Sequence, residues 1–274
     1  MRYTRLLIWR KRMPINTPEA FSGIDRLYGG NAYQKLSRRR VYVVGIGGVG
    51  SWVVEGLARS GIGEIRMADL DDVCITNTNR QVHALISTIG QSKVEVMAAR
   101  CLEINPGIAI RCDQAFVSGK TVEDQIEGDL DLVIDCGDNQ MAKAALIAHC
   151  RRLKIPVITL GAAGGRIDPS KVKVRDLAKT DGDALLAAVR QTLRNRHGFS
   201  RTSGKRFSVN AVYSDEQTRY LQVNGSVGQQ KPSEGANRLD CAGSLGAVTH
   251  VTAVFAFHAT AKAIEMLLTR LPQS

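Results

Sequence analysis

The 274-residue chain is poor in aromatic residues and in proline: Phe, Trp and Tyr make up 5% of it, and proline occurs 7 times. Glycine, in contrast, occurs 26 times. Close glycine turns between strands and helices are typical of α/β proteins, and this composition argues against a β-sandwich. Hydrophobic residues (44%) and charged residues (23%) are near the globular average, which excludes a disordered or collagen-like chain.

The sequence also lacks paired cysteines. Its 6 cysteines never form a C-x-x-C pair, which argues against a zinc knuckle and a thioredoxin motif. We expect reduced thiols, and therefore a cytoplasmic protein. The basic opening stretch contains only the short apolar run Leu6-Leu7-Ile8-Trp9, too short for a signal peptide, and Met13 is an alternative start.

A longer apolar stretch, Ala242 to Leu268, could cross a membrane by its length alone. It contains His250, His258 and Lys262, and many small residues. Charged and polar groups are costly in lipid, so this stretch is interpreted as a core helix, and we expect no integral membrane span.

Basic residues outnumber acidic ones, and their distribution is uneven. The net charge is +11, and residues 151–210 contain 14 Lys and Arg against 4 Asp and Glu. Two interpretations are open, a solvated basic face or a surface that binds an anionic partner, and the clustering favours nucleic acid. The candidate nucleic-acid residues are Arg190, Arg194, Arg196, Arg201, Lys205 and Arg206.

Apolar runs alternate with amphipathic stretches as far as residue 165. The pattern predicts strands over 41–44, 64–69, 108–112, 130–136 and 155–160, and helices over 51–60, 91–104 and 139–153. This order is typical of an α/β fold: a Rossmann-like, mostly parallel sheet of four or five strands with helices on both faces.

The alternation weakens after residue 165. The pattern there predicts a basic helix over 184–196, a mobile basic loop over 201–206, a short strand over 209–214 and the apolar C-terminal helix. We therefore expect one packed unit with an N-terminal basic segment open to disorder (1–20), a nucleotide-binding core (21–165) and a C-terminal elaboration (166–274).

A glycine-rich turn follows the first predicted core strand. It includes Gly45, Gly47, Gly48 and Gly50 in the G-x-G-x-x-G spacing, and Asp69 ends the next strand. Such a turn brings backbone N–H groups against phosphates, but NAD, FAD and ATP proteins all use it. The turn alone therefore predicts a dinucleotide-type fold without choosing the nucleotide.

The polar residues that follow the turn are more specific. They are Asp69 and Asp71 of D-L-D-D-V, Asn77, Arg80 and Gln81 of N-T-N-R-Q, Lys93 on the next predicted helix, and Asp138 and Asn139 after a buried strand. This set offers a carboxylate for a ribose (Asp69), two cations for triphosphate oxygens (Arg80, Lys93) and a carboxylate for Mg²⁺ (Asp138). Together they predict an ATP site.

At these residues the chain resembles the ThiF/MoeB/HesA family, which is related to ubiquitin-activating enzymes. The resemblance implies that MgATP adenylates a carboxylate and releases pyrophosphate. It also implies a homodimer in which Arg26 reaches the partner's triphosphate, although a surface helix arginine is the alternative interpretation. The implied catalytic residues are Arg80, Lys93, Asp138 and Arg26, with Asp138 as the metal ligand.

Within this family the chain departs from the members that activate sulfur carriers, because those commonly hold zinc with two C-x-x-C pairs. It is more similar to a branch that dehydrates threonylcarbamoyladenosine in tRNA, through G-A-A-G-G-R-I-D-P (161–169), D-L-A-K-T (176–180) and R-L-D-C-A (238–242). That branch implies a tRNA partner, a cyclic product and a cysteine-desulfurase or sulfur-acceptor partner as a further possibility. Adenylation of a ubiquitin-like sulfur carrier is the alternative.

Cys241 has two open interpretations. Related enzymes use a cysteine to take the acyl group, and a following helix could lower the pKa of its thiol. It is equally a structural cysteine at a helix start.

Two hypotheses from other classes complete the set. A nicotinamide dehydrogenase would need the turn and Asp69, but not Arg80, Lys93 and Asp138 together. A non-catalytic RNA-binding module would explain the basic segment and leave the nucleotide site unexplained.

Overall fold

The computed structural model describes residues 7–9, 17–222, 224–231 and 245–269. Its strands are β1 (Leu7–Trp9), β2 (Arg40–Val44), β3 (Glu64–Ala68), β4 (Ala109–Asp113), β5 (Leu132–Asp135), β6 (Val157–Leu160), β7 (Val172–Asp176), β8 (Asn210–Ser214), β9 (Tyr220–Leu221) and β10 (Val227–Gly228). Its helices are α1 (Thr17–Ala20), α2 (Ser22–Tyr28), α3 (Ala32–Leu36), α4 (Gly50–Arg59), α5 (Lys93–Ile104), α6 (Val122–Gln125), α7 (Gln140–Arg152), α8 (Ala184–Arg196) and α9 (Thr249–Thr269).

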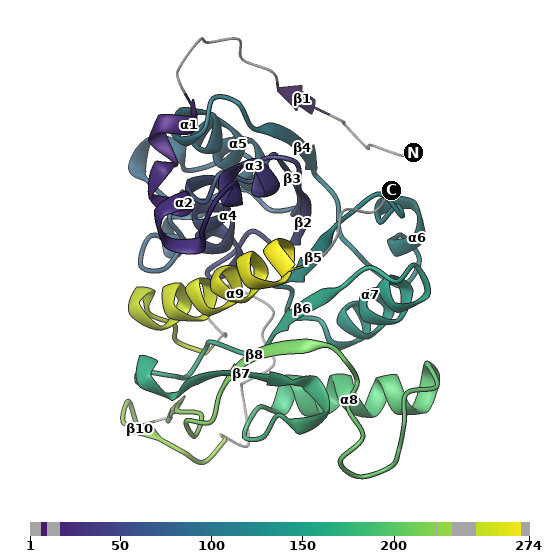
Figure 1. Ribbon diagram of the computed structural model, residues 1–274. Helices are drawn as coiled ribbons and strands as arrows, with labels where there is room; N and C mark the ends of the chain where they lie inside the picture. The colour runs from purple at the N-terminus through teal and green to yellow at the C-terminus, as the bar shows by residue number, and fades with distance from the viewer. Residues whose placement is uncertain (1–6, 10–16, 223, 232–244, 270–274) are drawn as a thin grey trace.

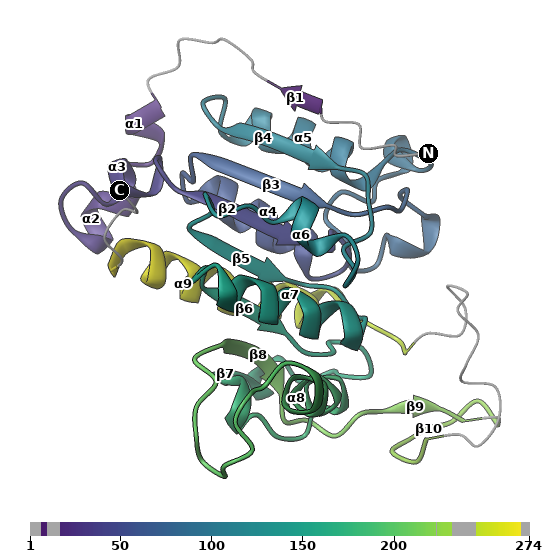
Figure 2. The same ribbon diagram turned by 90° about the vertical axis from the view of Figure 1, so that its right-hand side faces the viewer.

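One sheet organises the fold. Its strand order is β1-β4-β3-β2-β5-β6-β8-β7, in which the six strands from β4 to β8 are parallel and β1 and β7 are antiparallel edges. The six parallel strands follow the doubly wound order, with the reversal between β2 and β5. The two-stranded β9–β10 hairpin lies apart from this sheet (Figure 2).

Helices lie on both faces of the sheet (Figure 1), and side chains that alternate along the strands form a core under each helix layer. Val41 and Val43 pack with α4, α5 and α9, whereas Tyr42 and Val44 pack with α7 and α8. A period of two is what a strand buried on both faces requires. The three layers confirm the predicted Rossmann-like fold with helices on both faces.

The sheet is larger than the sequence pattern predicted, with six parallel strands instead of four or five. The additional one is β8, which pairs with β6 although about 50 residues separate them in the chain. The strand predicted over 209–214 is thus an internal strand next to the edge strand β7, and the main sheet continues beyond residue 165. The intervening α8 spans the 184–196 range predicted for the basic helix.

The α9 helix is long and apolar enough to cross a membrane by length and composition, but its inner side is packed in the core. Val251, Phe255 and Ala259 are fully buried, and α9 packs mainly against α4. This packing agrees with the interpretation as a core helix.

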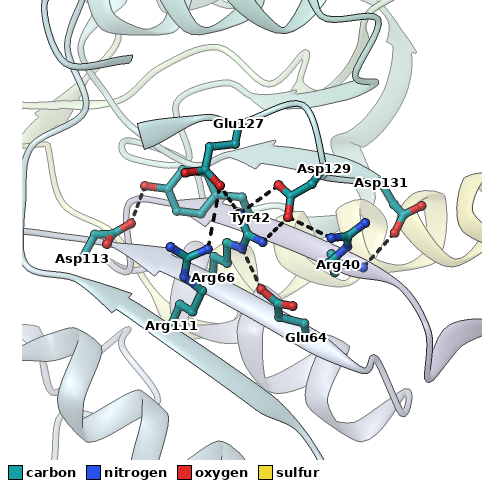
Figure 3. A network of polar contacts seen from close by, with 9 residues as sticks. All are labelled: Arg40, Tyr42, Glu64, Arg66, Arg111, Asp113, Glu127, Asp129 and Asp131. Carbon is teal, nitrogen blue, oxygen red and sulfur yellow. Dashed lines mark hydrogen bonds and ion pairs between the residues drawn. The ribbon is translucent and has the colours of Figure 1, made fainter. Parts of the chain in front are cut away.

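A network of polar side chains lies over β2, β3 and β4, on the face of the sheet that Tyr42 shares with α7 and α8 (Figure 3). Arg66 is almost buried there and forms ion pairs with Glu64 (2.7 Å) and Asp129 (2.5 Å). The Tyr42 hydroxyl donates to Asp113 (3.1 Å), and burial raises the pKa of Tyr42 well above its ordinary value. A connected polar network can close a sheet face without an apolar helix, because its members satisfy one another.

Candidate functional site

The glycine turn joins β2 to α4 at the point where the strand order reverses. Gly45 has a φ of +84°, a conformation that favours glycine, and a Cβ on it would lie 3.1 Å from the backbone carbon of Cys136. A Cβ on Gly50 would lie 1.8 Å from the carbonyl oxygen of Gly45. The loops after β2 and β5 therefore touch, and neither glycine can be replaced without moving backbone.

Asp69 follows β3 and holds this turn in place. Its Oδ2 accepts a hydrogen bond from the N–H of Ile46 (2.6 Å), and its Oδ1 accepts one from the N–H of Asp71 (2.9 Å). Burial raises the pKa of the Asp69 carboxyl, although Lys93 and these hydrogen bonds act in the opposite direction. Asp69 thus lies against the turn, where a ribose carboxylate is expected.

The N-T-N-R-Q segment packs over the same turn. Buried Asn77 closes a short loop, because its Oδ1 accepts from the N–H of Cys74 (3.0 Å). The Cγ and Cδ atoms of Arg80 lie 3.4 Å from a Cβ placed on Gly48. The Arg80 Nη1 donates a hydrogen bond to the carbonyl oxygen of Thr76 (2.7 Å). The Gln81 Nε2 lies 4.0 Å from a Cβ placed on Gly47.

Lys93 begins α5 and is almost buried at the edge of the site. Its Nζ lies 2.8 Å from Asp71 Oδ2 and 4.0 Å from Asp69 Oδ1. These contacts hold the ammonium group beside the turn, where a triphosphate would compete for it.

Asp138 and Asn139 lie between β5 and α7. Asn139 caps α7, because its Oδ1 accepts from the N–H groups of Met141 and Ala142 (3.0 Å each). Asp138 is exposed at the carboxyl end of β5. Among the described residues no group of three acidic, His or Cys side chains could hold a metal ion, so Asp138 would need a ligand's own oxygens to complete a site.

A buried ion pair beneath this loop was missed by the sequence reasoning. Asp135 Oδ2 lies 2.9 Å from Lys143 Nζ and accepts a hydrogen bond from Thr159 (2.7 Å). Lys143 also donates to the carbonyl oxygen of Gly137 (2.8 Å), which fixes the backbone just before Asp138. The available signal was an acidic residue in an apolar strand together with a lysine in an apolar helix.

The structure therefore gathers one predicted set at the carboxyl ends of β2, β3 and β5 and leaves other residues elsewhere. The gathered set is Gly45, Gly47, Gly48, Gly50, Asp69, Asp71, Asn77, Arg80, Gln81, Lys93, Asp138 and Asn139. Arg26 is exposed on α2, which lies toward the opposite end of the strands (Figure 2). Cys241 lies outside the described residues.

The six candidate nucleic-acid residues follow α8 toward the start of β8, away from the glycine turn. Arg190 contacts the Thr180 hydroxyl, and Arg194 lies over the Phe207 ring (5.4 Å) and donates to the carbonyl oxygen of Ser200 (3.3 Å). The other four are exposed. They are Arg196, Arg201, which donates to Asn195, Lys205, and Arg206, whose Nε lies 3.8 Å from Asp176.

The sheet order and the glycine turn at its switch point define a nucleotide-binding protein of the doubly wound α/β class. The family model described as the ThiF family matches residues 23–273, so the chain belongs to the ThiF family.

Individual relatives agree with this assignment. The chain is 45% identical to the tRNA threonylcarbamoyladenosine dehydratase of Escherichia coli K12, over 96% of this chain and 95% of the relative. A crystal structure of the E. coli dehydratase in complex with ATP superimposes with a TM-score of 0.80, at 42% identity over 91% of this chain and 94% of the other. The sulfur carrier protein ThiS adenylyltransferase of E. coli is 34% identical over 48% of this chain and 52% of its own length.

Proposed function

We propose that this protein is an ATP-dependent tRNA threonylcarbamoyladenosine dehydratase. The observation that carries the proposal is the near full-length similarity to the E. coli enzyme of that name, combined with a site whose turn, cations and carboxylates suit a nucleoside triphosphate. ATP and tRNA are its substrates. The described cysteines are free thiols, as a cytoplasmic enzyme requires.

The reaction activates a carboxylate and then closes a ring. The threonyl carboxylate oxygen attacks the ATP α-phosphorus, the bond to the bridging oxygen breaks, and pyrophosphate leaves. A nitrogen of the carbamoyl group then attacks the activated carbonyl and loses its proton while AMP departs. The modified adenosine loses one water in total, and the oxygen of that water ends in AMP.

This chain's residues act by binding and by electrostatic stabilisation. N–H groups of the turn face the phosphates, and Arg80 and Lys93 offset the charge that develops as pyrophosphate leaves. Asp69 positions the ribose. Lys93 must exchange Asp71 for a phosphate oxygen, so Asp71 holds the lysine ready before ATP arrives.

Magnesium fits the site through Asp138. One exposed carboxylate, next to a loop fixed by Lys143, suits an ion that takes its remaining ligands from phosphates and water. When bound, Mg²⁺ would neutralise phosphate charge.

Ring closure is intramolecular, so it needs no thioester on Cys241. A Cys241→Ser variant should therefore keep substantial turnover. Complete loss of turnover together with a trapped tRNA thioester would contradict this.

The enzyme acts as a homodimer in which Arg26 serves the partner's site. Support comes from the position of α2, toward the end of the strands opposite its own glycine turn. Inactive Arg26→Ala and Asp138→Ala chains, mixed under conditions of subunit exchange, should regain about a quarter of the parental activity, because half of the dimers would contain one intact site. No recovery despite exchange would place Arg26 outside the site.

The test of the proposed function is mass spectrometry of nucleosides from modified tRNA incubated with the protein and MgATP. We expect a product lighter by one water, formed only with ATP and accompanied by AMP and pyrophosphate. Adenylation of a ubiquitin-like carrier's C-terminus, with tRNA left unchanged, would instead support the sulfur-carrier alternative.

A further inference from the structure

A groove of about 730 Å³ opens at the amino ends of β6 and β8. Val157 at the start of β6, Val209 just before β8 and Thr269 at the end of α9 line it. Because β2, β5, β6 and β8 are parallel, the glycine turn lies at the other end of the same sheet. The groove is therefore separate from the proposed ATP site.

Cations from two distant parts of the chain converge on this groove. Arg151 and Lys154 come from the end of α7 and the residues after it, and Lys205 and Arg206 come from the loop before β8. All four are exposed, and no acidic residue is among the described residues that line the groove. Asp176, which lies 3.8 Å from Arg206, is not among these lining residues, so the lining of the groove is basic and its charge favours an anionic occupant.

Aromatic contacts fix the wall of the groove on which these cations sit. The Arg151 guanidinium lies 4.4 Å from the centre of the Phe199 ring, and Arg194 covers Phe207, which lines the groove. Phe199 and Phe207 also pack edge to face, with ring centres 5.0 Å apart. This packing ties the loop to α7 and holds cations on both sides of one hollow.

We propose that this groove binds backbone phosphates of tRNA at a distance from the nucleotide that reacts. The proposal rests on the proposed function and adds Arg151 and Lys154 to the cations of the predicted basic segment. A five-residue strand spans about 16 Å, and a nucleic-acid duplex rises about 3 Å per base pair. About five base pairs of a tRNA arm thus match the length of one strand, from the groove end of the sheet to its other end.

The surroundings favour an extended polyanion over a small anion. Residues 151–210 have a local net charge of +10, and α8 carries part of that charge along the sheet between its two ends. A small anion would need one enclosed pocket with converging donors, whereas this groove is open and its cations are spread over two walls.

The test compares charge-reversed variants with a matched control. Lys154→Glu/Lys205→Glu changes the groove and keeps the Arg151–Phe199 contact, and Lys35→Glu/Lys120→Glu makes the same charge change on α3 and before α6. For the parent protein and each variant, binding of tRNA that carries threonylcarbamoyladenosine is measured by filter retention over a series of salt concentrations. Nucleotide binding, measured in parallel, reports whether each variant is folded.

We expect the groove variant to bind tRNA at least about tenfold more weakly at 0.1 M salt, with the slope of log affinity against log salt reduced by roughly 1.5 to 2. The control variant should lose much less affinity and keep the parental slope. The milder Arg151→Gln variant should reduce the slope by about 1 and raise KM for tRNA with little change in kcat.

An unchanged affinity and slope in the folded groove variant would overturn the proposal, and so would equal losses in groove and control variants. Retention of tRNA binding that is abolished by millimolar inorganic phosphate at constant ionic strength would identify a small-anion site instead. Failure of the proposed function is distinguishable: a chain that binds tRNA through the groove and forms no cyclic product contradicts the dehydratase assignment alone.

Discussion

The two ends of the sheet differ in the interactions that form them: close packing at one end and exposed charge at the other. At the carboxyl ends of β2, β3 and β5, glycines, Asp69 and buried ion pairs meet at contact distance. At the amino ends of β6 and β8, exposed cations surround an open groove.

The two ends therefore tolerate different kinds of substitution. A site that positions reacting atoms depends on shape, and interaction there changes with displacements below one ångström. A surface that attracts phosphates depends on charge, which acts over several ångströms and weakens with salt. Substitutions that change shape should therefore affect the first end, and substitutions that change charge should affect the second.

The largest effect is expected for Gly50→Ala. The new Cβ would lie 1.8 Å from the Gly45 carbonyl oxygen, so the turn has to move and overpacking costs about 1 to 3 kcal/mol or more. ATP affinity, measured by calorimetry, should fall at least about a hundredfold. Gly47→Ala is the matched control, because its Cβ meets only Gln81 Nε2 at 4.0 Å, and its Tm should stay within about 2 °C of the parent. Normal ATP binding by Gly50→Ala would show that this end of the sheet does not depend on the shape of the turn.

Asp138→Ala tests the chemistry at the same end without a change of packing. Asp138 is exposed, so the fold should survive, whereas kcat for MgATP-dependent turnover should fall at least about a hundredfold. Asp124→Ala, an exposed carboxylate on α6, should behave like the parent. If a folded Asp138→Ala enzyme kept its activity, the Mg²⁺ assignment would be wrong.

The sequence predicted which glycines and polar residues gather at the shape-dependent end, because the contacts that bring them together are mostly local. The turn, Asp69 and Asn77 act on neighbours close in the chain or on the next strand, so their spacing predicted the arrangement. The Asp135–Lys143 pair was not predicted, because both residues lie in apolar runs that periodicity assigns to the core.

The charge-dependent end was only partly predictable. Clustering identified a basic segment, but its place relative to the glycine turn depends on α8 returning along the sheet and on β8 pairing with β6. The contribution of Arg151 and Lys154 depends on the same long-range pairing, because about 50 residues separate them from Lys205. No local pattern contains that information.

A pH-dependent loss of stability is expected from His83, which is fully buried near Lys93 and Arg100. Neither ring nitrogen has a hydrogen-bond partner among the described residues, and burial lowers the His83 pKa to about 4. The unfolded chain binds the proton near pH 6.5 and the folded chain does not, so stability falls as pH drops from about 6.5 toward 4.

The maximum loss is about 3 kcal/mol, from 1.36 kcal/mol for each pKa unit. Unfolding by urea at several pH values should therefore show a shallower dependence for His83→Phe than for the parent. Exposed His250→Phe is the control, expected to keep the parental dependence. Parallel curves for the parent and His83→Phe would mean that His83 takes up its proton in the folded state.

The smallest effect is expected for single substitutions of Arg190 and Arg206, which should change the salt dependence of tRNA binding to different extents. Arg190 is half-buried on α8 with its guanidinium against Thr180, whereas the Arg206 side chain is 73% exposed at the groove. The Arg206 Nε lies 3.8 Å from the buried Asp176 carboxylate, which already accepts hydrogen bonds from the N–H groups of Phe207 and Ser208, so the exposed guanidinium can still bind a phosphate. Arg206→Ala should reduce the salt slope of tRNA binding by about 1.

Arg190→Ala should leave most of that slope in place and lower the free energy of unfolding by about 1 kcal/mol, because it removes an inward hydrogen bond. Equal losses of slope in the two variants would show that Arg190 turns outward to meet RNA, and the segment would then bind along α8 as well as at the groove.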